Sequence, residues 1–150
     1  MRPHLKHLQP YHSARAEYDG EGQIFLDANE NPFESELNRY PDPHQNHLKK
    51  KITELKEIDS TNIFIGNGSD EDIDLLLRIF AEPGKHQIVQ HVPTYGMYAV
   101  AALSHNVEVI NVALDDSFQL DLAAMEASFS DKTRLLFICS PNNPTGNLID

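Results

Sequence analysis

The sequence predicts an α/β fold, in which an N-terminal arm precedes part of a large domain with a mainly parallel sheet flanked by helices. From residue 44 onward, short apolar segments alternate with helical patterns, which is typical of parallel strands joined by right-handed crossovers. The last apolar segment, 135–139, is apolar at every position. This pattern is expected of a strand that is covered on both faces.

The first part of the chain, 1–43, has little periodicity and is rich in Pro, Asn, Asp and Gly. We therefore predict an arm with loops, containing one short strand at 23–29. The remaining residues, 44–150, are predicted to form an incomplete large domain.

The first helix is predicted at 42–58, since Asp42 is a candidate N-cap and Pro43 suits a first turn. Its apolar residues recur at helical spacing, at Leu48, Ile52, Leu55 and Ile58. A strand is predicted at 62–68, where an apolar segment runs into a glycine turn. The next helix, 69–84, is expected to end at Pro83-Gly84.

The rest of the chain repeats the alternation of strand and helix. Strands are predicted at 87–92, 107–114 and 134–140, with helices at 95–105 and 121–129. The resulting order is β-α-β-α-β-α-β.

Composition restricts the function. The chain has 150 residues, 40% hydrophobic and 23% charged, which fits a soluble globular protein. A net charge of -11 argues against a nucleic-acid partner. We find neither a membrane span nor a secretory signal in this sequence, and Cys139 is its only cysteine. A cytoplasmic location is therefore expected.

Three of the predicted strands end in unusual turns, at 66–71, 93–98 and 140–146. In a parallel sheet, ligands bind beyond the carboxyl ends of the strands. The three turns are therefore expected to lie on one edge of the sheet.

The turn at 66–71, GNGSDE, opens a helix. The backbone N–H groups of Ser69, Asp70 and Glu71 then form a candidate phosphate site. An ordinary capped helix is the alternative interpretation. The neighbouring carboxylates mean that cations for a phosphate must come from elsewhere.

The other two turns contain candidate ring contacts. Tyr95 follows a strand end and can stack on a planar ligand, although simple packing is the alternative. Asn143 precedes Pro144, which holds its backbone extended and leaves its amide available as a donor. The alternative for this turn is a rigid loop without a ligand.

Five motifs together resemble the fold-type I, pyridoxal-phosphate-dependent aminotransferase family, and within it the histidinol-phosphate branch. They occur in the family's order and are LDANENPFE (26–34), RYPDP (39–43), GNGSDE (66–71), PTYGMY (93–98) and CSPNNPTG (139–146). The resemblance implies amino transfer between histidinol phosphate and 2-oxoglutarate/glutamate, in the biosynthesis of histidine.

The resemblance also implies roles for individual residues. The backbone around Ser69 and Asp70 would hold the cofactor phosphate, and Tyr95 would stack on the pyridine ring. Asn143 would donate a hydrogen bond to the ring oxygen. In a homodimer, Tyr40 would reach the phosphate of the neighbouring subunit's cofactor. Two residues would lie near the substrate, Tyr11 and Asn29.

The family's reaction needs a lysine that forms a Schiff base and moves a proton. No lysine in this sequence lies in a matching context. We therefore expect the sequence to be the N-terminal part of a longer enzyme and the 150 residues alone to be inactive, with no catalytic residue among them.

Two classes of alternative remain open. One is a related enzyme of the same branch, such as a phosphothreonine decarboxylase or an aromatic aminotransferase. The other is a non-catalytic α/β binding protein, including a flavodoxin-like domain. The eight histidines lack a completed ligand set, so no metal site is predicted.

Overall fold

The computed structural model describes residues 1–13, 15, 18, 24 and 26–149. The chain divides into two compact units, one formed by Gln9–Ile65 and the other by Met1–Leu8 together with Gly66–Asp150. Each unit is considered separately below. The α/β fold predicted from the sequence lies in the second of these units.

The sheet has three strands, β1 (Gln87–Val92), β2 (Glu108–Ala113) and β3 (Thr133–Phe137), in the order β2-β1-β3. Both pairings are parallel. The central strand, β1, is the most buried of the three. The predicted parallel sheet is thus confirmed for these strands, and the prediction for β1 has the correct bounds.

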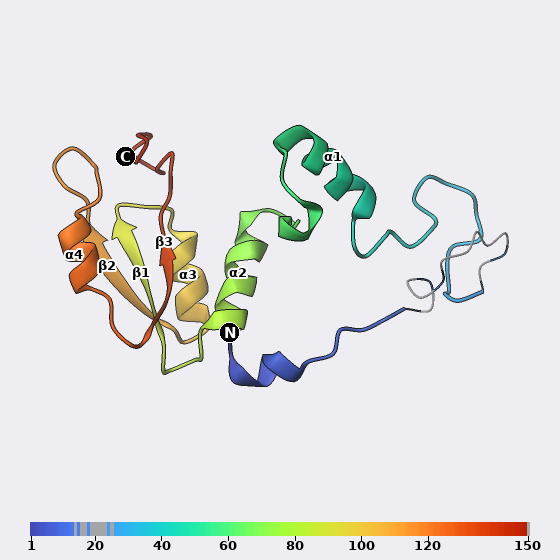
Figure 1. The fold of residues 1–150 in the computed structure, drawn as a ribbon, viewed down its shortest axis with the longest axis horizontal. Helices are drawn as coiled ribbons and strands as arrows, with labels where there is room; N and C mark the ends of the chain where they lie inside the picture. Colours follow the sequence, from blue (N-terminus) through green and yellow to red (C-terminus); the bar gives the residue numbers. More distant parts are fainter. Residues whose placement is uncertain (14, 16–17, 19–23, 25, 150) are drawn as a thin grey trace. The chain divides into compact units, whose positions relative to one another are not determined.

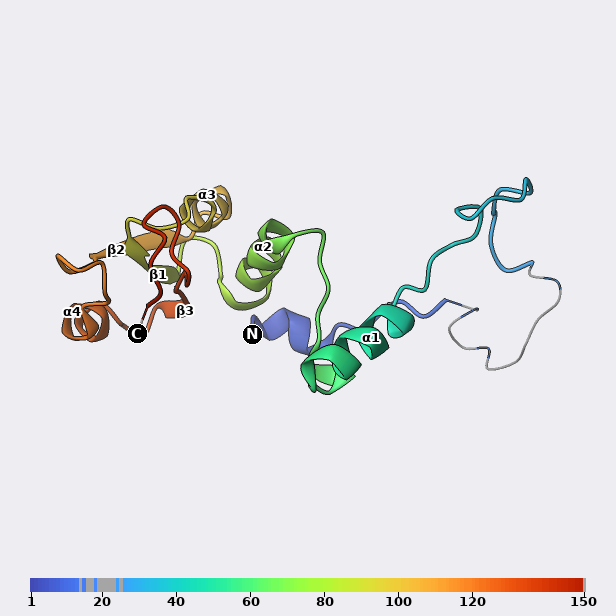
Figure 2. The same cartoon turned by 90° about the horizontal axis from the view of Figure 1, so that it is seen from above.

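Helices lie on both faces of this sheet (Figures 1 and 2). They are α2 (Ser69–Phe80), α3 (Met97–Ser104) and α4 (Leu122–Ala127). One apolar cluster joins Leu77 of α2 and Ala102 of α3 to Ile88 of β1. A second cluster places Met125 of α4 against Val89. Successive residues of β1 therefore face opposite helical layers, because side chains alternate along a strand.

The strand predicted at 62–68 is wrong, and the strand predicted at 134–140 is wrong in part. Residues 62–68 form no strand: Ser60–Asn62 is a 3-10 helix, η2, and Phe64 is 65% exposed. No described strand pairs with this segment, so its apolar pattern has no ladder to join. The strand predicted at 134–140 is shorter, because β3 ends at Phe137. Within 135–139, expected to be covered on both faces, Leu136 and Ile138 are more than 40% exposed.

The unit formed by Gln9–Ile65 contains α1 (Asn46–Lys56) and η2. The start predicted for α1 at Asp42 is wrong, because α1 begins at Asn46. The Asp42 carboxylate instead accepts the N–H groups of His44 and Asn46 in the turn before the helix. The apolar stripe of α1 contains no buried residue. The predicted strand at 23–29 includes positions outside the described residues, and its described residues form no strand.

The first eight residues belong to the sheet-containing unit. A 3-10 helix, η1 (Pro3–His7), follows Arg2, whose N–H donates to the Ile79 carbonyl at 2.7 Å. The Arg2 guanidinium also pairs with Glu82 at 3.2 Å. These contacts attach the first residues to the C-terminal end of α2.

Candidate functional site

The three unusual turns meet, as the sequence predicts. The Tyr95 hydroxyl donates to Asp70 Oδ1 at 3.0 Å and joins the second turn to the first. The Thr94 hydroxyl donates to Asn142 Oδ1 at 3.3 Å and joins the second turn to the third. Segments more than 70 residues apart in sequence are thus linked at one end of the sheet by side-chain hydrogen bonds.

The first turn leads into α2 through Gly68, whose φ of 84° and ψ of 167° are accessible mainly to glycine. Gly68 has no side chain with which to cap the helix, and the N–H groups of the first turn begin at Ser69. The predicted contributor Glu71 points back into its own loop, where its carboxylate accepts the Asn67 backbone N–H at 2.5 Å. The three backbone N–H groups predicted to bind an anion, at Ser69, Asp70 and Glu71, stay candidates, because the direction of the Glu71 side chain does not occupy its own N–H.

The Tyr95 ring is held by other aromatic rings. It meets Tyr98 edge to face at 5.6 Å, and Tyr98 stacks on Phe137 at 4.7 Å with an interplanar angle of 10°. The hydrogen bond to the Asp70 carboxylate raises the pKa of Tyr95. Burial raises the pKa of Tyr98 to about 12. The Tyr95 ring is thus held in place by its neighbours, and its hydroxyl is neutral at physiological pH.

The two asparagines of the third turn have different environments. Asn142 is 3% exposed, and its Nδ2 donates to the Pro93 carbonyl at 3.0 Å and to Thr145 Oγ1 at 2.7 Å. Asn143 is exposed. The peptide bonds before Pro93, Pro141 and Pro144 are cis. Asn142 therefore stabilises the turn, whereas the Asn143 side chain is left exposed.

His91 is not among the residues predicted for the site. This imidazole is 1% exposed near the end of β1, and its Nε2 accepts the Cys139 backbone N–H at 3.1 Å. The sequence signal that could have identified it is a histidine inside a predicted strand. Cys139 falls within the strand predicted at 134–140, but it lies beyond β3 and is only partly buried.

Two other predicted residues, Tyr11 and Tyr40, line a common cavity of about 910 Å³ in the unit formed by Gln9–Ile65. Asn29 is exposed and does not line this cavity. Glu30 follows Asn29 in the sequence, and its carboxylate accepts the Tyr40 N–H at 2.8 Å and pairs with Arg15 and Arg39. These ion pairs lower the pKa of Glu30 to about 2, and the pair with Arg15 has the largest effect.

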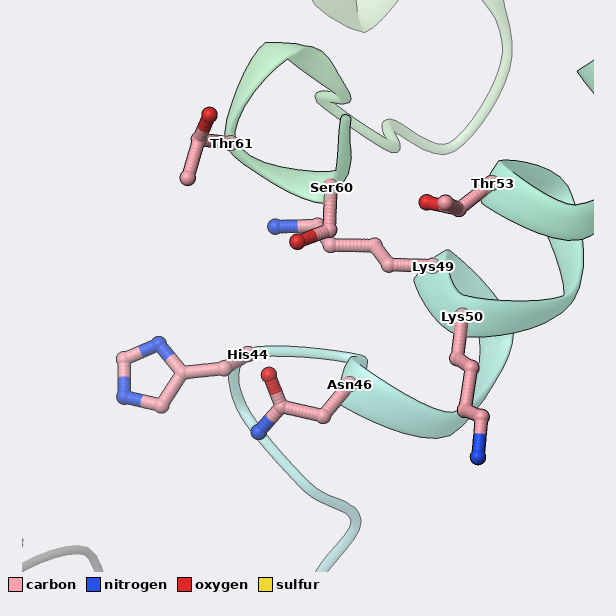
Figure 3. A pocket seen from close by; sticks show the side chains of 7 residues that line it. All are labelled: His44, Asn46, Lys49, Lys50, Thr53, Ser60 and Thr61. Carbon is pink, nitrogen blue, oxygen red and sulfur yellow. The ribbon is translucent and has the colours of Figure 1, made fainter. Parts of the chain in front are cut away.

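A smaller hollow of about 380 Å³ lies beside α1 (Figure 3). The Lys49 side chain extends toward Ser60, whereas Lys50 turns away. None of the residues predicted for the site lines this hollow. Its lining residues are His44, Asn46, Lys49, Lys50, Thr53, Ser60 and Thr61.

The described residues contain neither a metal-binding cluster nor a membrane-spanning helix. No cluster of three or more His, Cys, Asp or Glu side chains in this part of the chain could hold a metal ion. None of the described helices is both long and apolar enough to cross a membrane.

Comparison with known proteins identifies the family. A family model described as aminotransferase class I and II matches residues 17–150. The chain belongs to this family. The histidinol-phosphate aminotransferase of Parabacteroides distasonis is 51% identical over 150 residues, which cover 100% of this chain and 44% of that protein. The chain thus spans less than half the length of this aminotransferase.

Solved aminotransferase structures share the fold. The histidinol-phosphate aminotransferase from Clostridium acetobutylicum matches with a TM-score of 0.66 and 32% identity, over 76% of this chain and 32% of its own. The enzyme from Sinorhizobium meliloti, in complex with pyridoxal 5'-phosphate, matches with a TM-score of 0.66 and 24% identity, over 73% and 29%. The predicted α/β aminotransferase fold is therefore confirmed.

Proposed function

We propose that the protein containing these residues is a pyridoxal-phosphate-dependent aminotransferase. In this proposal it moves an amino group between histidinol phosphate and 2-oxoglutarate/glutamate in histidine biosynthesis. The observation that carries the proposal is the meeting of three turns at one end of the sheet, where Tyr95 and Asn143 lie on neighbouring turns. The 51% identity to a histidinol-phosphate aminotransferase supports the choice of substrate.

The residues present fit the cofactor. When bound, pyridoxal phosphate supplies an electron sink for the carbon that carries the amino group. Tyr95 would cover one face of its ring, and exposed Asn143 would donate to the ring oxygen. Backbone N–H groups at Ser69 and Asp70 would bind the phosphate at the positive end of α2. Glu71 would act indirectly, by fixing Asn67 in the same loop.

The carboxylates at this helix end need compensation. Asp70 already accepts from Tyr95, and Glu71 accepts from Asn67. We propose that cations for the phosphate, together with the lysine for proton transfer, come from parts of the protein outside these 150 residues. Tyr40 would supply a further contact to the phosphate across a homodimer, while Tyr11 and Asn29 would lie near the substrate.

An assay of the intact protein tests this function. Purified protein with pyridoxal phosphate and 2-oxoglutarate is supplied with histidinol phosphate, phenylalanine or phosphothreonine, and glutamate and carbon dioxide are measured. Glutamate formed fastest from histidinol phosphate is the expected result. Preferred use of phenylalanine would assign an aromatic aminotransferase, and release of carbon dioxide from phosphothreonine would assign a decarboxylase.

A protein without catalysis is the alternative from another class. It would keep the three turns and bind pyridoxal phosphate without amino transfer from any donor. Binding without turnover in the same assay would favour it.

We further propose a cytoplasmic location, which fluorescence of the tagged intact protein would test.

A further inference from the structure

The buried imidazole of His91 links two segments of the proposed cofactor site. A polar group removed from water needs a partner, and His91 Nε2 has the Cys139 backbone N–H at 3.1 Å. The Thr94 hydroxyl lies 3.5 Å from the same nitrogen. The side chain therefore joins the end of β1 to the residue at which the turn 139–146 begins.

The direction of this hydrogen bond fixes the state of the ring. Because Nε2 accepts an N–H, this nitrogen carries no proton, and the neutral tautomer has its proton on Nδ1. Burial lowers the pKa of His91, whose Nδ1 is buried without a hydrogen-bond partner among the described residues. The imidazole therefore stays neutral, and remains an acceptor, at physiological pH.

The residues after His91 bind the turn at a second position, Asn142. The Pro93 carbonyl accepts from Asn142 Nδ2 at 3.0 Å, and Thr94 donates to Asn142 Oδ1. The turn is thus attached to one short segment of chain, 91–94, at both Cys139 and Asn142. Asn143 directly follows the second attachment and is exposed.

We propose that His91 is a positioning residue that orients the turn 139–146 so that Asn143 faces the cofactor ring. This inference rests on the proposed function, since it assigns a ligand to Asn143. His91 does not touch the ligand in this account. It acts by accepting the Cys139 backbone N–H at the start of the turn.

The test compares two variants of the intact protein, His91→Leu and His91→Gln. Leucine removes the acceptor, whereas the glutamine amide oxygen can reach the position of Nε2. A buried N–H without an acceptor is costly, so His91→Leu should weaken binding of pyridoxal phosphate roughly tenfold and shift the absorption maximum of the bound cofactor. His91→Gln should retain the wild-type absorption spectrum and bind within about threefold of wild type.

A double-mutant cycle with Asn143→Ala separates positioning from a general loss of stability. If His91 acts through Asn143, adding His91→Leu to Asn143→Ala should cause no further spectral shift and little further loss of affinity. Fully additive effects would overturn the proposal, as would a His91→Leu protein with wild-type affinity and spectrum. Should His91→Leu fail to fold, His91→Asn takes its place, because its shorter amide does not reach Cys139.

The outcomes distinguish this inference from the proposed function. Wild-type intact protein that binds no pyridoxal phosphate would refute both. Wild-type protein that binds the cofactor through Asn143, with His91→Leu unchanged, would refute the positioning role alone.

Discussion

Adjacent asparagines in the third turn provide a matched pair for mutation. The buried Asn142 side chain donates to Pro93 and Thr145, so Asn142→Ala should lower the free energy of unfolding by about 1–3 kcal/mol. Exposed Asn143→Ala should change it by less than about 0.5 kcal/mol. Urea unfolding of the intact, cofactor-free protein measures both. Equal losses in the two variants would show that this division of roles is wrong.

The Glu30 carboxylate provides a test by pH. Its side chain is 5% exposed, and its partners Arg15 and Arg39 lower its pKa from 4.5 to about 2. A lowered pKa means that its stabilising contribution is complete above about pH 4.5 and is lost as the pH falls toward 2. The Tyr40 amide, which donates to Glu30, should report this titration in its NMR chemical shift.

The control for this titration is Glu30→Gln, which keeps an acceptor but has no carboxylate. In that variant the Tyr40 amide shift should show no step in the acid range. A wild-type midpoint near 4.5 would mean that the ion pairs do not form in solution.

Sequence patterns identified some residues of the site and not others. The location of Tyr95 and Asn143 on turns at the sheet edge was predictable from the prolines and glycines around them, whereas their contacts with a cofactor stay predictions. The direction of Glu71 and the partner of His91 were not predictable. Each depends on which atoms the fold brings near, and the residues 91 and 139 are 48 positions apart.

At the scale of elements, the start of α2 depends on a glycine. Gly68→Ala would force a side chain into a backbone conformation with a φ of 84°, at a cost of about 1–3 kcal/mol. We expect a lower unfolding midpoint in urea and weaker binding of pyridoxal phosphate by the intact protein, since the N–H groups of Ser69 and Asp70 would shift.

Gly96 is the matched control for Gly68. A Cβ at either glycine meets no atom within 4 Å, but Gly96 has an ordinary helical φ of -64°. Gly96→Ala should therefore leave both stability and cofactor affinity nearly unchanged. Equal losses in the two variants would contradict the role given to the backbone at Gly68.

The strands show where the apolar sequence pattern and the observed structure differ. Strands β1 and β2 match their predicted ranges within one residue, because each has a partner in the sheet. Residues 62–68 have the same apolar character but no partner strand among the described residues. Apolar periodicity predicts that a segment can be buried, whereas a strand also needs a neighbour to satisfy its backbone groups.

At the scale of the whole molecule, the sheet-containing unit supplies one wall of the proposed site. The 150-residue chain alone should show no amino transfer from histidinol phosphate to 2-oxoglutarate, since none of its lysines lies in the context that the family uses. Glutamate formation by the purified chain, compared with the intact protein at equal concentration, checks this. Turnover by the isolated chain would mean that one of these lysines acts in catalysis.

The most direct test of the central claim is a crystal structure of the intact protein with pyridoxal phosphate. The account predicts that the cofactor ring lies against Tyr95, with Asn143 Nδ2 about 3 Å from the ring oxygen. It also predicts that the phosphate lies at the N-terminus of α2, beside Ser69. A cofactor bound elsewhere, in contact with neither Tyr95 nor Asn143, would contradict the account.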